Sequence, residues 1–307
     1  MAFVVEGFLL KALHVFQVRT LQSLGYGTRI ALSNKSQNKG ALATDYRVDL
    51  SVYSPDGMSS TYHEDVARLP TDAMVRLDCT RWQTHPGEDQ VMIFHLIPDR
   101  LLPAVSAAGE VDLDRSEIWS LFTAQDHYVE YYRPDGFSSG VLYQSGAFNY
   151  RKFSREETTV IQAPKVFLSN TLDTVLSVLH TSFEPEYQQE AVMRCALLDE
   201  HARPVAQWTS RIRPFTGQLI SMKEKLLESG GMLLPAGGLQ AYTLLGLCEN
   251  AALLPLIMNV DSENHTLAVE HSLPPMYYGQ AVTGPVRAKM VADLRSSGVF
   301  AAEQGSR

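Results

Sequence analysis

The sequence is poor in cysteine and contains no motif of clustered metal-binding cysteines. Three cysteines occur in 307 residues, Cys79, Cys195 and Cys248, and no two of them have a CxxC spacing. An odd number of scattered cysteines argues against a disulfide framework or a zinc knuckle and predicts buried, apolar thiols in a reducing compartment. We therefore expect a cytoplasmic protein.

The chain also lacks an excess of positive charge and any long apolar run. Its 26 lysines and arginines stand against 34 acidic residues, which gives a formal net charge of −8. Such a surface repels phosphate backbones, so we expect no nucleic-acid partner. Near the N-terminus, Glu6 precedes the apolar stretch and Lys11 interrupts it, a pattern that fits neither a secretory signal nor a membrane span. Residues 1–27 are expected to form a strand or short helix packed on the body.

What the sequence does contain is a globular composition with strand-like periodicity. Hydrophobic residues make up 45% and charged residues 20% of a chain long enough for two domains. In residues 46–54 (YRVDLSVYS), apolar and polar side chains alternate, so that Tyr46, Val48, Leu50 and Val52 share one face. The runs at 73–79 (AMVRLDC) and 91–97 (VMIFHLI) also have the length and composition of strands.

Turn signals separate these strands. The segments SPDG at 54–57 and RPDG at 133–136 place proline where φ is preset and glycine where a positive φ is required. Short strands with this punctuation predict an antiparallel sandwich or barrel. The clearest helical pattern is residues 285–298, with Pro285 in the first position and Gly298 as the stop. We expect this helix to pack against a sheet and residues 299–307 to be disordered.

Four pairs of segments recur in the same order along the chain. The pairs are IALSN (30–34) with VFLSN (166–170), DLSVYSPDG (49–57) with RCALLDEHA (194–202), VARLP (66–70) with SRIRP (210–214), and residues 132–150 with 260–278. Their offsets differ only by loop-sized amounts, which predicts a duplicated module of roughly 130 residues. The alternative is chance similarity between β-rich segments.

The LSN segments, which we expect to open strands, together with the Asp-Gly hairpins and proline-bearing strands, resemble those of tandem immunoglobulin-like β-sandwich modules of bacterial type. The resemblance implies an all-β fold with two tandem antiparallel sandwiches, at 28–164 and 165–284, followed by the C-terminal helix. The second copy departs from the pattern, because it has DEHA and DSEN where the first has Pro-Asp-Gly. The resemblance concerns architecture, and no functional residue is carried over from it.

Two clusters of histidine and acid could suggest metal ligands. In HTLAVEHS (265–272), a strand would place His265 and His271 about 20 Å apart, too far for one metal ion. In YHED (62–65), His63 and Asp65 would share a strand face, but no third ligand is supplied by a recognisable motif. We predict no metal and no cofactor.

Signals for nucleophilic or phosphate chemistry are equally weak. Ser145 in YQSG lacks the GxSxG context of a nucleophile elbow, and SGGMLLPAGG (229–238) lacks the Lys-Ser/Thr of a phosphate loop. We interpret the latter as a loop between two strands. Cys195 alternates with apolar neighbours and is expected in the core rather than in a catalytic site.

Aromatic residues near strand ends give the broadest functional hint. Tyrosine brings contact area and a hydroxyl at low entropic cost, and it is common at binding surfaces. The candidate ligand-binding residues are Trp82, His85, Tyr131, Tyr132, Tyr277 and Tyr278.

Two hypotheses follow. The first is a non-catalytic binding or scaffolding protein built from two fused β-sandwich modules. The alternative is an enzyme with an aromatic-lined, mostly apolar cleft between the modules, acting on a small organic substrate without a metal, with His271 as the candidate catalytic residue. The partner stays open: a protein, a small molecule or a second copy of the chain.

Overall fold

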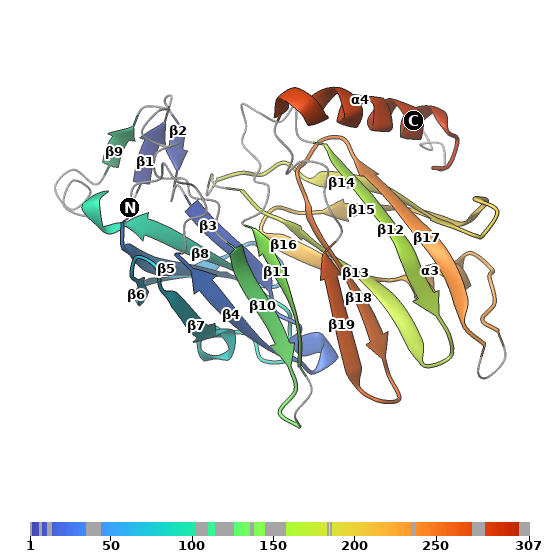
Figure 1. The fold of residues 1–307 in the computed structure, drawn as a ribbon, viewed down its shortest axis with the longest axis horizontal. Coiled ribbons are helices and arrows are strands. Elements are labelled where there is room, and N and C mark those ends of the chain that lie inside the picture. Colours follow the sequence, from blue (N-terminus) through green and yellow to red (C-terminus); the bar gives the residue numbers. More distant parts are fainter. Residues whose placement is uncertain are drawn as a thin grey trace. The chain divides into compact units, whose positions relative to one another are not determined.

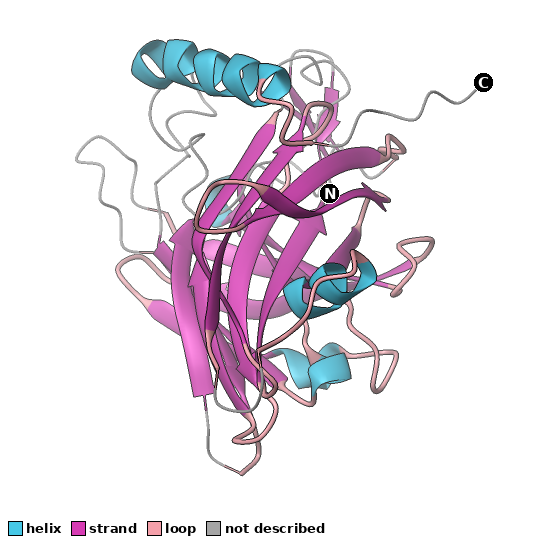
Figure 2. Ribbon diagram, turned by 90° about the vertical axis from the view of Figure 1, so that its right-hand side faces the viewer, coloured by secondary structure: helices cyan, strands magenta, loops and turns pink. Residues whose placement is uncertain are grey.

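The computed structural model describes residues 2–5, 8–10, 14–34, 44–101, 110–113, 126–135, 138–144, 158–182, 184, 186–234, 238–271 and 280–300. The chain is divided into two compact units, residues 1–150 with 181–188, and residues 151–180 with 189–307. Strands dominate both units (Figures 1 and 2), which confirms the predicted all-β class. The predicted module boundaries stay a prediction.

Unit 1 contains two four-stranded antiparallel sheets. The first has the order β3 (His14–Arg19), β8 (Val91–Pro98), β5 (Tyr46–Tyr53) and β6 (Ser60–Leu69). The second has the order β11 (Ser138–Gln144), β10 (Asp126–Tyr132), β4 (Gly27–Ser33) and β7 (Met74–Asp78). A further small sheet joins β2 (Phe8–Leu10), β1 (Ala2–Val5) and β9 (Glu110–Leu113), with β1 and β9 parallel. The described part of this unit also contains the short 3-10 helices η1 (Gln22–Leu24), η2 (Cys79–Trp82) and η3 (Asp99–Leu101).

The described residues of unit 2 form two antiparallel sheets and two α-helices. The first sheet has the order β12 (Thr159–Leu168), β17 (Gln240–Cys248), β14 (Ala191–Leu198) and β15 (Pro204–Ile212). The second has the order β16 (Thr216–Ser221), β13 (Leu172–His180), β18 (Leu254–Asp261) and β19 (Thr266–His271). The helices are α3 (Met222–Glu228) and α4 (Gln280–Ser296).

The two units have the same strand order. In chain order, β3 to β8 correspond to β12 to β17, and β10 and β11 correspond to β18 and β19. With this correspondence, each four-stranded sheet of unit 1 has the same strand pairings as one sheet of unit 2. Three of the four sequence matches fall on corresponding strands. The fourth does not, because IALSN lies in β4 whereas VFLSN ends β12.

Each unit buries its core between its own two sheets. In unit 1 the ring of Phe16 on β3 lies 4.9 Å from that of His127 on β10, and the Tyr131 hydroxyl donates to the carbonyl of Arg19. In unit 2 one buried cluster joins Met193 and Leu244 of one sheet with side chains of the other, including Ile257. Burial of these apolar faces is the main stabilising contribution to each sandwich.

Strand β5 follows the predicted alternation on one face but not on the other. Tyr46, Val48, Leu50 and Val52 are buried as expected, and yet the opposite face is buried as well. There the fully buried carboxylate of Asp49 accepts hydrogen bonds from Arg47 and from the Tyr62 hydroxyl, and Ser51 bonds His95. These bonds give partners to the carboxylate of Asp49 and the hydroxyl of Ser51, which allows the two groups to be buried.

The two suspected metal-ligand clusters are turn and bulge residues. Asp65 has φ +51° at a register shift between β5 and β6, and its amide donates to Asp49. The bulge breaks the simple alternation that the sequence predicted for His63 and Asp65. His265 has φ +52° in the turn before β19, so it does not share the strand with His271. No group of three potential metal-binding side chains occurs among the described residues.

The turns and cysteines agree with expectation where they are described. Gly57 and Gly298 both have positive φ, as the hairpin and the helix end require. Cys79, Cys195 and Cys248 are free and buried. The segments around Ser145 and residues 299–307 lie outside the described residues, apart from Val299 and Phe300, and Phe300 is buried.

Two helical features differ from the prediction. Helix α3 was not predicted, although Ser221 and Glu224 have the spacing of a capping box and the Ser221 hydroxyl accepts from the amide of Glu224. The segment 229–238 therefore follows a helix, whereas we expected a strand before it. Helix α4 begins at Gln280 rather than at Pro285, and Val291 and Phe300 anchor it against the outer face of the β12–β17–β14–β15 sheet.

Candidate functional site

The structure distributes the aromatic candidates rather than grouping them. Tyr131 is fully buried in the core of unit 1, and the half-buried Trp82 packs edge-on against Phe94 with ring centroids 6.5 Å apart. His85 lies in a loop held by Gln90, whose side chain accepts from the backbone amide of His85. Tyr277 and Tyr278 lie outside the described residues, as does the side chain of His271.

Tyr132 differs from these because it lies on the outer face of the β11–β10–β4–β7 sheet. Its ring crosses over Gly27 on β4, where a Cβ would come within 2.5 Å of the ring. Its hydroxyl donates to Asp78 on β7 at 2.9 Å, and the guanidinium of Arg29 stacks 3.7 Å above the ring centroid. Arg29 also faces Asp78 at 3.6 Å. The four residues form a fixed wall on this face.

A pocket of about 690 Å³ lies next to that wall. Seven outward-facing side chains of β4, β7 and β10 line it: Arg29, Ala31, Met74, Arg76, Asp78, Tyr128 and Glu130. All the lining residues belong to unit 1. The volume is within the range of pockets that hold small organic ligands, about 300–1,000 Å³.

The strand register explains why the face is hollow. Ala31 pairs with Tyr128 on one side and with Arg76 on the other. Neighbouring strands are about 4.8 Å apart, so the backbones of Tyr128 and Arg76 are separated by about 10 Å. Between them stands Ala31, whose short side chain leaves this part of the face low, although neighbouring side chains leave Ala31 itself only 5% exposed.

Tyr128 widens the hollow further by lying over the neighbouring strand β11. A Cβ at Gly140 would come within 2.0 Å of the Tyr128 hydroxyl, which shows that the side chain extends across that glycine. Gly140 and Gly27 therefore leave room for the side chains of Tyr128 and Tyr132. A glycine in the interior of a strand often marks such a close approach.

Asp78 organises the β7 end of the pocket. Its carboxylate caps η2, accepting from both the amide and the hydroxyl of Thr80, and it also accepts from Tyr132. Partial burial alone would raise the pKa of this carboxyl, but the hydrogen bonds from Thr80 and Tyr132 and the charge of Arg29 outweigh it and lower the pKa. Asp78 is therefore ionised at neutral pH and fixes Arg29 as well as the helix that carries Arg81.

The pocket contains two cationic groups to which no described residue is bonded. Neither Arg76 nor Arg81 forms a hydrogen bond or ion pair within the described part of the chain, and both line the pocket. Glu130 of β10 pairs with Arg29 of β4. It supplies one carboxylate on the side of the pocket opposite Arg76. Among the described residues of the lining there is no serine, cysteine or histidine. The arrangement is thus suited to binding and holds no nucleophile–base pair of the usual kind.

Sequence reasoning selected Tyr132 but missed the other pocket residues. Alternation within 27–33 already places Arg29 and Ala31 on one face, and alternation within 73–79 does the same for Arg76 and Asp78. The pairing of β4 with β7 and β10 was the missing information.

In the described residues, no helix is long and apolar enough to cross a membrane.

No protein-family model matches the chain, and no curated protein does. Among solved structures it is similar to a β-glucuronidase from glycoside hydrolase family 2, with 9% identity over 85% of this chain and 23% of that one and a TM-score of 0.20. It is also similar to two glycosyl hydrolase family 2 members from Bacteroides cellulosilyticus, each with 10% identity, over 83% and 84% of this chain, with TM-scores of 0.17 and 0.20. The chain spans about a quarter of the length of these proteins. Similarity at such TM-scores does not establish a shared fold.

Proposed function

We propose that the chain is a non-catalytic binding protein built from two fused, immunoglobulin-like β-sandwich modules that arose by internal duplication. The identical strand order of the two units supports the duplication. The two four-stranded antiparallel sheets that share a core in each unit support the sandwich description. Three free, buried cysteines fit a reducing, cytoplasmic setting.

The observation that carries the binding function is the pocket over Ala31 on the outer face of unit 1. A rigid sheet holds its floor, and the contacts among Tyr132, Arg29 and Asp78 fix one wall. A site supported in this way needs little reorganisation when a ligand enters, which favours binding.

The test is a fragment screen by protein-observed NMR on the full chain, repeated on Ala31→Phe, which fills the hollow. We expect fragments that perturb Arg29, Arg76 and Glu130 in the original protein and no longer bind the variant. Ala241→Phe is the matched control, because it adds the same ring to an exposed position on β17 of unit 2. Binding that survives Ala31→Phe, or no binding near these residues, would refute the proposal.

A further inference from the structure

We infer that the pocket over Ala31 binds a small organic acid, one molecule per chain, through a single carboxylate or phosphate group held by Arg76 and Arg81. This inference rests on the proposed function and adds the chemical class of the ligand. It follows from the charges around the pocket, from the shape of its walls and from a comparison with the corresponding face of unit 2.

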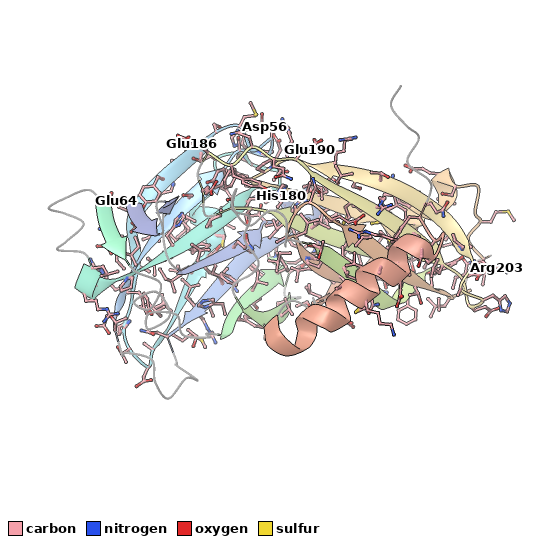
Figure 3. The ribbon with its side chains drawn as sticks, turned by 90° about the horizontal axis from the view of Figure 1, so that it is seen from above. Asp56, Glu64, His180, Glu186, Glu190 and Arg203 are labelled. Carbon is pink, nitrogen blue, oxygen red and sulfur yellow. The ribbon has the colours of Figure 1, made fainter. Side chains whose placement is uncertain are left out.

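Two arginines that form no ion pair with a described residue line one pocket of an acidic protein. The chain has eight more acidic than basic residues, and several arginines elsewhere are held by carboxylates, as Arg19 is by Asp89 and Arg203 by Asp199 (Figure 3 labels Arg203). Arg76 and Arg81 have no such partner within the described part of the chain, although both line the same pocket. A guanidinium group presents a planar set of donors that matches the oxygens of a carboxylate or phosphate.

The positions of both arginines suit a shared anion. Arg76 stands across Ala31 from Tyr128, at the edge of the hollow. Arg81 lies in η2, which begins directly after β7 and is capped by Asp78. Since Asp78 is also bonded to Tyr132, the helix that carries Arg81 is tied to the wall of the pocket.

The remaining walls indicate what the rest of the ligand resembles. The ring of Tyr128, the methyl group of Ala31 and the side chain of Met74 offer apolar contact. Glu130 lies on the side opposite Arg76 and would repel a second negative charge. The lining therefore fits a molecule with one anionic group and a neutral body, and it disfavours polyanions.

Among the described residues, the corresponding face of unit 2 presents no equivalent set of charged side chains. The strands β13 and β18 correspond to β4 and β10, and their outward residues include Val175, Ser177, Leu256 and Met258. These four side chains are buried and provide no charge. The strand order is shared, whereas the charged pocket is specific to unit 1, which gives a stoichiometry of one.

The experiment is calorimetric titration of the full chain with benzoate, phenyl phosphate and the neutral analogue benzamide. We expect one site per chain for the two anions and binding of benzamide weaker by at least about tenfold, the factor expected for losing one charge-assisted hydrogen bond. Arg76→Gln combined with Arg81→Gln should weaken anion binding by a similar factor. Arg213→Gln is the matched control, because Arg213 is an exposed arginine of unit 2 without an ion pair among the described residues.

The outcomes separate this inference from the function on which it rests. If benzamide and the anions bind equally well and Ala31→Phe abolishes this binding, the preference for an anionic ligand is refuted, whereas the proposed binding function is retained. Two anion sites per chain, or anion binding unchanged in the double arginine variant, would also overturn it. Absence of binding by all three probes, together with a fragment screen without hits near Ala31, would refute both the anion inference and the proposed binding function.

Discussion

The ring of Tyr132 lies directly over Gly27, so closely that a Cβ at residue 27 would come within 2.5 Å of it. This contact lets the tyrosine cross from β10 over β4 and reach Asp78 on β7. Tyr132 can take this position because Gly27 of β4 has no side chain, and Gly27 therefore determines the position of the pocket wall.

Gly27→Ala should destabilise unit 1 by about 1–2 kcal/mol, because the methyl group displaces Tyr132 and breaks its hydrogen bond to Asp78. The measurement is chemical unfolding of the full chain. In a Tyr132→Ala background the same Gly27→Ala change should be neutral or stabilising, since alanine is preferred over glycine in a strand interior. Equal costs in both backgrounds would contradict the contact.

Asp78→Ala should cost roughly 1–2 kcal/mol of stability, because it removes the cap of η2 and the acceptor for Tyr132. The binding of benzoate should weaken as well, since Arg29 and η2 lose their common anchor. Chemical unfolding and calorimetry measure the two effects. Asp56→Ala, which removes an exposed turn carboxylate bonded to Ser54 (Figure 3 labels Asp56), provides a control that should leave benzoate binding unchanged.

The same carboxylate predicts a pH dependence. Its pKa is lowered in the folded protein, so ionised Asp78 contributes stability above the ordinary pKa of 3.8. That contribution is lost as the pH falls through the lower, folded pKa. Comparing unfolding midpoints of the original protein and Asp78→Asn between pH 6 and pH 3 should show a difference that shrinks with acidification. A constant difference would contradict the lowered pKa.

His180, at the end of β13 (Figure 3), predicts a second pH dependence, which comes from a basic group rather than from a carboxyl group. Burial lowers its pKa to about 4, although its bond with the carbonyl of Ile212 partly opposes this. The unfolded chain therefore takes up a proton near pH 6.5 that the folded chain resists until about pH 4.

The resulting stabilisation should be fully present above about pH 6.5 and should fall, by up to about 3 kcal/mol, as the pH drops toward 4. His180→Gln has no titrating ring and should lack this component. The measurement is the difference between the unfolding free energies of the two proteins at pH 7.5 and pH 4.5. An identical acid loss in both would assign the effect to other groups.

Phe300→Ala should release helix α4 from the outer face of the first sheet of unit 2. Phe300 is buried with Val291 against Ala196 and Leu247, and its truncation should cost about 3 kcal/mol at most. Hydrogen exchange should accelerate at residues 288–298 and remain slow in β14. Asp293→Ala changes an exposed residue of the same helix and should have little effect.

The sequence by itself determined several of the strands and turns and the burial of the three cysteines. Alternation is a local property, so Val48 and Leu50 could be placed in the core from their neighbours alone, and Gly57 and Gly298 indicated their own left-handed conformations. The bulge at Asp65 escaped prediction because it depends on a hydrogen bond to Asp49 on the partner strand.

Only the tertiary structure decided which faces are buried and which side chains meet. Asp49 and Ser51 have the spacing of a solvated strand face, and yet both are buried in a hydrogen-bonded network. Arg29, Arg76 and Tyr128 belong to three distant segments, and they line one pocket because β4 pairs with both β7 and β10. Strand pairing is a non-local choice among backbones that all offer the same hydrogen bonds, and therefore periodicity alone does not encode it.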